Sequence, residues 1–98
     1  MATTTTDRDG ETLCIRGDLD FDSVAELWNA TESLFAATPP SRIDLSGIRR
    51  ANSAGVALLV EWFGQAQRQG QALVFVNVPE QMRAIIAIAD LDTVLPLA

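Results

Sequence analysis

The segments of this chain alternate between strand-like and helix-like hydrophobic patterns, and this order limits the folds that the chain can adopt. Asp9-Gly10 is typical of a two-residue hairpin turn, here between a Thr-rich segment, 3–7, and a segment of alternating apolar and polar residues, 11–16. We therefore predict that the fold begins with two antiparallel strands.

A loop and then a helix are expected to follow the hairpin. Residues 17–22 are rich in Asp and contain a Gly, which favours a loop. Ser23 and Glu26 are spaced as a helix capping box, and Asp22 is the alternative cap. Over residues 24–35 the apolar side chains recur at three- and four-residue steps, which predicts an amphipathic helix.

The remaining segments continue the alternation of strands and helices. Pro39-Pro40 stops the first helix, and Gly70 is a typical end of the second. The expected elements are a strand at 42–45, a helix at 54–69, a strand at 71–76 and a third helix that Pro79 opens as its first residue. The tail, 91–98, is compatible with either an edge strand or a last turn. Because parallel strands need a crossover element, this order predicts an α/β fold, in which helices pack on a small mixed sheet that starts with an antiparallel hairpin.

Length and composition predict one domain over residues 1–98, with residues 1–6 frayed. Cys14 is the single cysteine, and its apolar neighbours suggest a buried strand position in a reducing compartment. The chain shows neither a secretory signal nor an apolar run long enough to span a membrane, so we expect a soluble cytoplasmic protein without direct membrane insertion.

The residue types that are missing argue against an enzyme. The chain has no His, Lys or Tyr, which removes the usual general base, the Schiff-base amine and the phenol acid. Paired carboxylates, Asp18 with Asp20 and Asp90 with Asp92, are better interpreted as turn and cap residues. We expect no catalytic residues, no metal site and no cofactor. The net charge of -6 argues against nucleic-acid binding, so a protein is the expected partner.

The residues at the N-terminus of the second helix, Asn-Ser-Ala-Gly at 52–55, have two interpretations. Ser53 is a good N-cap, because its hydroxyl can accept a hydrogen bond from a backbone N–H of the first turn. The pair Ala54-Gly55 would also leave an exposed backbone that another chain could approach closely. A phosphate on Ser53 would meet free amides and the positive end of the helix dipole, which makes Ser53 a possible phosphorylation site.

The second helix and the loop before it carry further candidate contacts. Leu58 and Trp62 widen the apolar face of the helix, and this flank either packs inside the domain or binds a partner. Arg49 and Arg50 are either a solvated pair or form a specific salt bridge.

Several short motifs occur in a fixed order over residues 11–95. They are GDLD at 17–20, IDLSGI at 43–48, NSAGVALL at 52–59, Gly70 before LVFV at 73–76, and PEQMR at 79–83. This pattern resembles the STAS domain of sulfate transporters and anti-anti-sigma factors. The resemblance implies a non-enzymatic interaction module with a mixed sheet and surrounding helices.

Within that family the chain is most similar to the stand-alone STAS subunits of Mla phospholipid-transporting ABC systems in Gram-negative bacteria. The resemblance implies that it binds and regulates or stabilises the cytoplasmic ATPase of such a transporter, which maintains outer-membrane lipid asymmetry, and that it lies peripheral to the inner membrane. Ser53 matches the family's contact hydroxyl, and in anti-anti-sigma factors the phosphorylated serine. The alternative is an anti-anti-sigma factor that binds an anti-sigma kinase, although Asn52 replaces the Asp typical of phosphorylated members. The expected partner-binding residues are Arg49, Arg50, Asn52, Ser53, Ala54, Gly55, Leu58 and Trp62.

Overall fold

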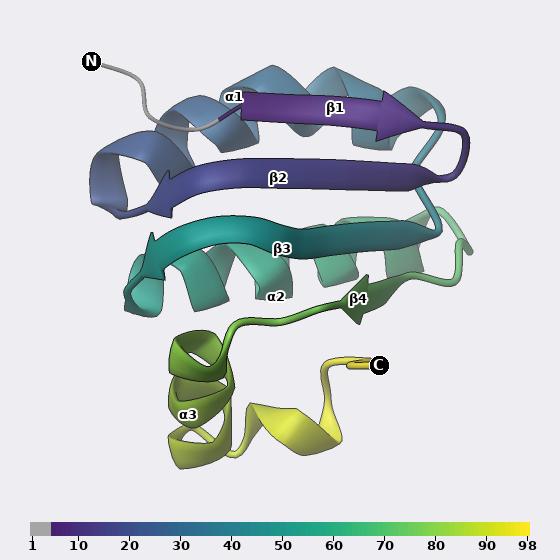
Figure 1. Cartoon of the computed structure of the whole chain (residues 1–98). Helices are drawn as coiled ribbons and strands as arrows, with labels where there is room; N and C mark the ends of the chain where they lie inside the picture. Colours follow the sequence, from purple (N-terminus) through teal and green to yellow (C-terminus); the bar gives the residue numbers. More distant parts are fainter. Residues whose placement is uncertain (1–4) are drawn as a thin grey trace.

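A four-stranded mixed sheet forms the centre of the molecule (Figure 1). A computed structural model describes residues 5–98. Its elements are β1 (Thr5–Asp9), β2 (Thr12–Leu19), α1 (Phe21–Ala37), β3 (Arg42–Ala51), α2 (Ser53–Arg68), β4 (Val74–Val76), α3 (Glu80–Ile88) and the 3₁₀ turn η1 (Leu91–Thr93). The strand order is β1-β2-β3-β4; β1 is antiparallel to β2, and the other neighbours are parallel. The predicted α/β fold with an initial hairpin is therefore confirmed.

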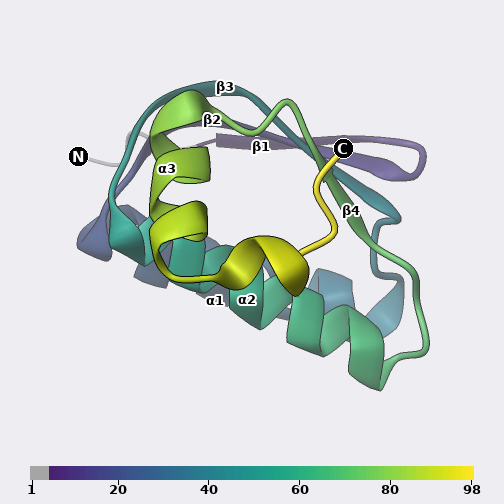
Figure 2. The same cartoon turned by 90° about the horizontal axis from the view of Figure 1, so that it is seen from below.

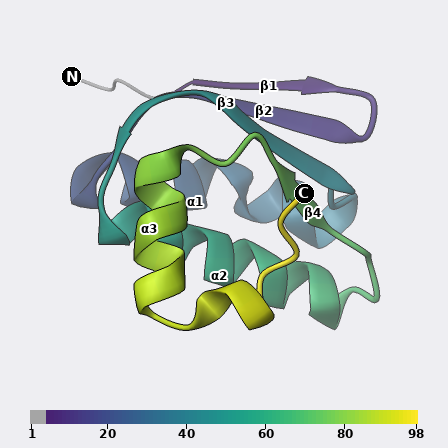
Figure 3. The same cartoon turned by 60° about the horizontal axis from the view of Figure 1, so that its bottom comes forward.

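The helices α1 and α2 cover one face of the sheet, and α3 with η1 lies toward the β4 side (Figures 2 and 3). The core lies between sheet and helices. Its fully buried side chains include Ile15, Leu45, Leu59, Phe75 and Met82, drawn from β2, β3, α2, β4 and α3. Because each element contributes inward-facing apolar residues, the five elements depend on a shared core.

β3 is longer than predicted, and the segment expected as an arginine-bearing loop is strand. The pairing between β2 and β3 shifts by one residue twice, between Cys14 and Arg16 and between Gly17 and Asp18. At each shift β3 contains one extra residue, which is a β-bulge. Buried positions on β3 are consequently three residues apart, at Leu45, Ile48 and Ala51. The strand prediction at 42–45 was too short because bulges break the two-residue period on which it depends.

The expected loop at 17–22 is also corrected, since β2 continues to Leu19 and α1 begins at Phe21. The hairpin loop is Gly10-Glu11, because Asp9 pairs with Thr12 and Gly10 adopts a positive φ of 61°. Residues 1–4, which include the start of the predicted Thr-rich strand, lie outside the described residues. Thr5 and Thr6 belong to β1, so the prediction of a frayed end was wrong for these two residues.

Three smaller expectations also differ from the structure. Cys14 is half-buried, because it alternates with the buried residues of β2 and so points to the face that α1 and α2 do not cover. Pro79 is the N-cap of α3, one position before the helix. β4 is shorter than expected, and the tail forms both a turn and a bridge, in which Leu97 pairs with Phe75.

Candidate functional site

The start of α2 follows directly from the end of β3, and Asn52 is its cap. The Asn52 side chain accepts a hydrogen bond from the backbone N–H of Ala54 at 2.9 Å. Ser53 is the first helical residue and is exposed, and its hydroxyl has no hydrogen-bond partner in the described part of the chain. The interpretation of Ser53 as the capping residue was therefore wrong. Asn and Ser are comparable N-caps, so two adjacent candidates could not be separated by residue type.

The next two residues of α2 are buried, which corrects the expectation of an exposed backbone. Ala54 is 6% exposed, and Gly55 is also buried. A Cβ atom added at Gly55 would lie 3.0 Å from the Leu19 Cβ atom. The glycine thus allows the first turn of α2 to approach the end of β2, and its role is packing within the domain.

Trp62 belongs to the core between α1 and α2. It is fully buried, and its ring stacks on Phe35 with a centroid separation of 5.7 Å and an interplanar angle of 5°. Leu58 is 2% exposed. Internal packing, one of the two interpretations of this flank, is therefore correct for Trp62. The expectation that Trp62 contacts a partner was wrong, because helix periodicity alone does not show that α1 covers this side of α2.

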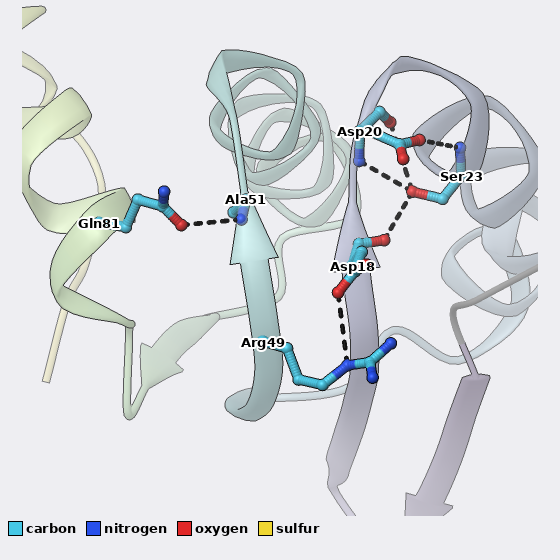
Figure 4. Close-up of polar contacts among 6 residues, drawn as sticks. All are labelled: Asp18, Asp20, Ser23, Arg49, Ala51 and Gln81. Atoms are coloured by element: carbon cyan, nitrogen blue, oxygen red, sulfur yellow. Dashed lines mark hydrogen bonds and ion pairs between the residues drawn. The ribbon is translucent and has the colours of Figure 1, made fainter.

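The two arginines of β3 have different environments. The Nε atom of Arg49 lies 3.4 Å from the Asp18 carboxylate on the adjacent strand (Figure 4), and the arginine side chain is 70% exposed. Arg50 is exposed and borders a polar depression of about 290 Å³, together with Asp20, Asn52 and Gln81. One of the predicted pair thus forms a salt bridge, and the other faces solvent beside the start of α2.

A capping box holds the start of α1 beside the same strand ends (Figure 4). The Asp20 side chain accepts from the Ser23 N–H at 2.9 Å, and the Ser23 hydroxyl accepts from the Asp20 N–H at 2.9 Å. The expected caps, Ser23 with Glu26 or Asp22, were therefore wrong by two or three positions: Asp20 is the N-cap and Ser23 the third helical residue. The Ser23 N–H holds the pKa of the Asp20 carboxyl below its ordinary value.

α3 is tied to the same region by a side-chain hydrogen bond. The Gln81 carbonyl oxygen accepts from the Ala51 N–H at 3.0 Å (Figure 4). Both helix starts, α1 and α2, follow parallel strands and lie at the carboxyl edge of the sheet. The Gln81 bond ties α3 to the last residue of β3, directly before the cap of α2, so the starts of α2 and α3 are held close together.

Two apolar grooves lie on either side of α2. The first, of about 330 Å³, lies between α1 and α2; the second, of about 350 Å³, lies between α2 and the α3–η1 segment. The first is lined by Phe21, Val24, Ala25, Trp28, Ala54, Ala57, Leu58 and Glu61. The second is lined by Ser53, Val56, Ala57, Val60, Glu61, Ile85, Ala89 and Leu91. Ala57 and Glu61 border both grooves and form the ridge between them.

The sequence-based prediction named only some of this surface. Ser53, Ala54 and Leu58 line a groove, whereas Phe21, which is 72% exposed, and Glu61 were missed. Ser53, Ala57 and Glu61 recur every four residues, so they share one solvent-facing side of α2. That spacing was a usable signal, but the neighbouring walls come from other helices.

The family model described as "Mlab, STAS domain" matches residues 2–96. The chain belongs to the STAS domain family. The intermembrane phospholipid transport system binding protein MlaB of Escherichia coli K12 is 32% identical to this chain over 88 residues, which cover 89% of each protein. The protein of the same name from Shigella flexneri matches equally. The predicted resemblance to STAS domains and to the Mla subunit is therefore confirmed.

Solved STAS structures share the fold at lower identity. An anti-sigma factor antagonist from Mycobacterium paratuberculosis is 23% identical, with a TM-score of 0.78, and covers 97% of this chain and 83% of its own. The unphosphorylated anti-sigma factor antagonist SpoIIAA is 17% identical, with a TM-score of 0.74, and the match covers 97% of this chain and 87% of that one. At these identities the likeness shows the STAS fold alone. In the STAS domain over residues 5–98, no helix has both the length and the hydropathy of a membrane span.

Proposed function

We propose that this STAS protein is a non-enzymatic subunit that binds and regulates the cytoplasmic ATPase of an ABC phospholipid transporter, one that maintains outer-membrane lipid asymmetry. The observation that carries the proposal is the 32% identity, over 89% of both chains, to a binding protein of an intermembrane phospholipid transport system. The protein would then lie at the cytoplasmic side of the inner membrane through its transporter.

The proposed contact surface is centred on Ser53, which is exposed at the first position of α2. Ala54 and Leu58 contribute to the wall of the first groove, and Arg50 with the exposed part of Arg49 forms a charged rim. Asn52 and Gly55 act by positioning the helix start. Trp62 supports the surface from the core. Regulation would follow from tighter binding to the competent arrangement of the ATPase than to other arrangements.

A pull-down with matched variants tests the proposal. The tagged chain is expressed at native level with the ATPase and permease of its own organism, and the retained proteins are identified by mass spectrometry. We expect the ATPase to be retained by the wild type and by Ser33→Arg, an exposed α1 control, and to be lost with Ser53→Arg. If the wild-type chain does not retain the ATPase in the pull-down, the proposed function is contradicted. Full retention by Ser53→Arg would contradict the site.

The alternative is an anti-anti-sigma factor that binds an anti-sigma kinase under phosphorylation of Ser53. Its support is the exposure of Ser53 at the first position of α2, where a phosphate would meet the positive end of the helix dipole, while the Ala54 and Gly55 N–H groups already donate to Asn52. Asn52, in place of the Asp typical of such factors, opposes it. Intact-mass measurement of the protein isolated from cells distinguishes the two, because stoichiometric phosphate on Ser53 would favour the kinase switch over the transporter subunit.

A further inference from the structure

The ridge between the two grooves carries one charge in an otherwise uncharged lining. Glu61 is exposed, and among residues 5–98 it is the sole charged residue that lines either groove. Ala57, one turn earlier, is the other residue shared by both grooves and offers only a methyl group. A partner could therefore approach α2 closely beside Ala57, but it would meet the Glu61 carboxylate.

Among residues 5–98, no cation pairs with that carboxylate. Within that range the Glu61 side chain has no ion pair and no hydrogen bond. Arg49 pairs with Asp18, and Arg68 on the same helix donates to Gln65. Filling the apolar grooves with a partner's side chains would remove water from around Glu61. Burial of an unpaired charge is costly, whereas a cation supplied by the partner offsets that cost.

The separation of the grooves limits the shape of the partner. They flank α2, and an α-helix with its side chains is about 10–12 Å across. On a partner helix laid across α2, residues seven apart rise by about 10.5 Å and lie on the same face. Two large apolar side chains at that spacing could enter the two grooves together. A Lys or Arg three or four residues after the first would then lie above the ridge.

We propose that α2 binds a helix of the ATPase subunit that carries a Lys or Arg between two large apolar residues, and that Glu61 selects this helix through its charge. This inference rests on the proposed function. The apolar residues occupy the two grooves, and the cation pairs with Glu61. Glu61 is thus a determinant of partner specificity, distinct from the Ser53 contact at the beginning of the helix.

Binding of the purified chain to the purified ATPase subunit, measured by isothermal titration calorimetry, tests this inference. Glu61→Lys is compared with Glu11→Lys, an exposed hairpin residue that lines neither groove and whose change alters the net charge equally. We expect Glu61→Lys to weaken binding by about thirtyfold or more and Glu11→Lys to change it by less than about threefold. Glu61→Gln should weaken binding by an intermediate factor. Circular dichroism melting of each variant verifies folding.

A charge swap on the partner completes the test. Each Lys or Arg on the exposed helices of the ATPase is changed to Glu, and one such variant should restore most of the affinity lost in Glu61→Lys. If the wild type does not bind the ATPase, the proposed function fails. If it binds and Glu61→Lys behaves like Glu11→Lys, or no swap restores affinity, the function stands and this inference is overturned. A dimer of the isolated chain that Ala57→Trp abolishes, with ATPase binding intact, would assign the grooves to a second copy and would also overturn it.

Discussion

The indole Nε1 of Trp62 donates a hydrogen bond to the Thr31 hydroxyl at 3.1 Å, and both side chains are buried between α1 and α2. The same hydroxyl donates to the Leu27 carbonyl oxygen of α1 at 2.8 Å. One threonine thus satisfies the only polar atom of the largest core residue while its own proton bonds to its helix. This pairing explains how a tryptophan and a threonine can be tolerated in an apolar seam.

Replacement of Thr31 by Val should destabilise the fold although the two side chains have nearly the same shape. The change leaves the buried indole N–H without an acceptor, which costs about 1–3 kcal/mol. The free energy of unfolding is measured in urea by tryptophan fluorescence. Thr38→Val, at an exposed position after α1, is the control and should change it by less than about 0.5 kcal/mol. Equal stability of the two variants would show that the indole finds another acceptor.

Substitutions at the start of α2 should separate capping from recognition. Asn52→Ala removes the oxygen that accepts from the Ala54 N–H, so the free energy of unfolding should fall by about 0.5–2 kcal/mol. Ser53→Ala removes an exposed hydroxyl with no hydrogen-bond partner in the described part of the chain. This change should alter the free energy of unfolding by less than about 0.5 kcal/mol. Urea midpoints measure both. A larger loss for Ser53→Ala than for Asn52→Ala would assign the cap to Ser53.

Because Asp20 is the N-cap of α1, the stability of the folded protein should depend on pH in the acid range. Because the Ser23 N–H lowers the pKa of Asp20 from 3.8, the folded protein binds fewer protons than the unfolded chain near that pH. The stabilisation is complete above pH 3.8 and is lost as the pH falls through the lower folded-state pKa. Asp20→Asn retains the capping oxygen and removes the titration.

Urea midpoints at neutral pH and near pH 3 provide the measurement. The urea midpoint of the wild type should be higher than that of Asp20→Asn at neutral pH, and the difference between the two midpoints should shrink in acid. Asp44 retains an acid dependence in both proteins, since the Ser46 N–H and the Asn77 amide lower its pKa. A difference that stays constant across this range would contradict the linkage.

The first bulge of β3 predicts that Gly47 cannot be enlarged without cost. A Cβ atom there would lie 2.6 Å from the Arg16 Cγ and 3.0 Å from the Ile15 carbonyl oxygen of β2. Gly47→Ala should therefore lower the free energy of unfolding by about 1–3 kcal/mol. Gly64→Ala is the matched control, because its nearest contact is an ordinary 3.5 Å to the end of the Arg68 side chain and alanine favours the helix. If Gly47→Ala proved neutral, the strands could separate locally at the bulge.

The parts of the fold that follow local patterns could be predicted from the sequence. The hairpin, the stripe of α1 and the stop of α2 at Gly70 each depend on residues that are close in the chain. Prediction failed where the local period changes or where neighbours compete. The bulges of β3 replace a two-residue period by steps of three, and Asn52 and Ser53 are both good caps in adjacent positions.

The order of helices and strands, the mixed sheet and the candidate Ser53 were decided by short-range periodicity, turn residues and caps, which act within a few positions. The tertiary structure alone decided that Trp62 is covered by Phe35 and Thr31, that Gly55 fits against Leu19, and that Ala57 and Glu61 separate two grooves. Each of these features joins side chains from different elements. Their positions depend on how α1, α2 and α3 pack around the sheet. The local sequence pattern does not specify the distances between side chains on different elements.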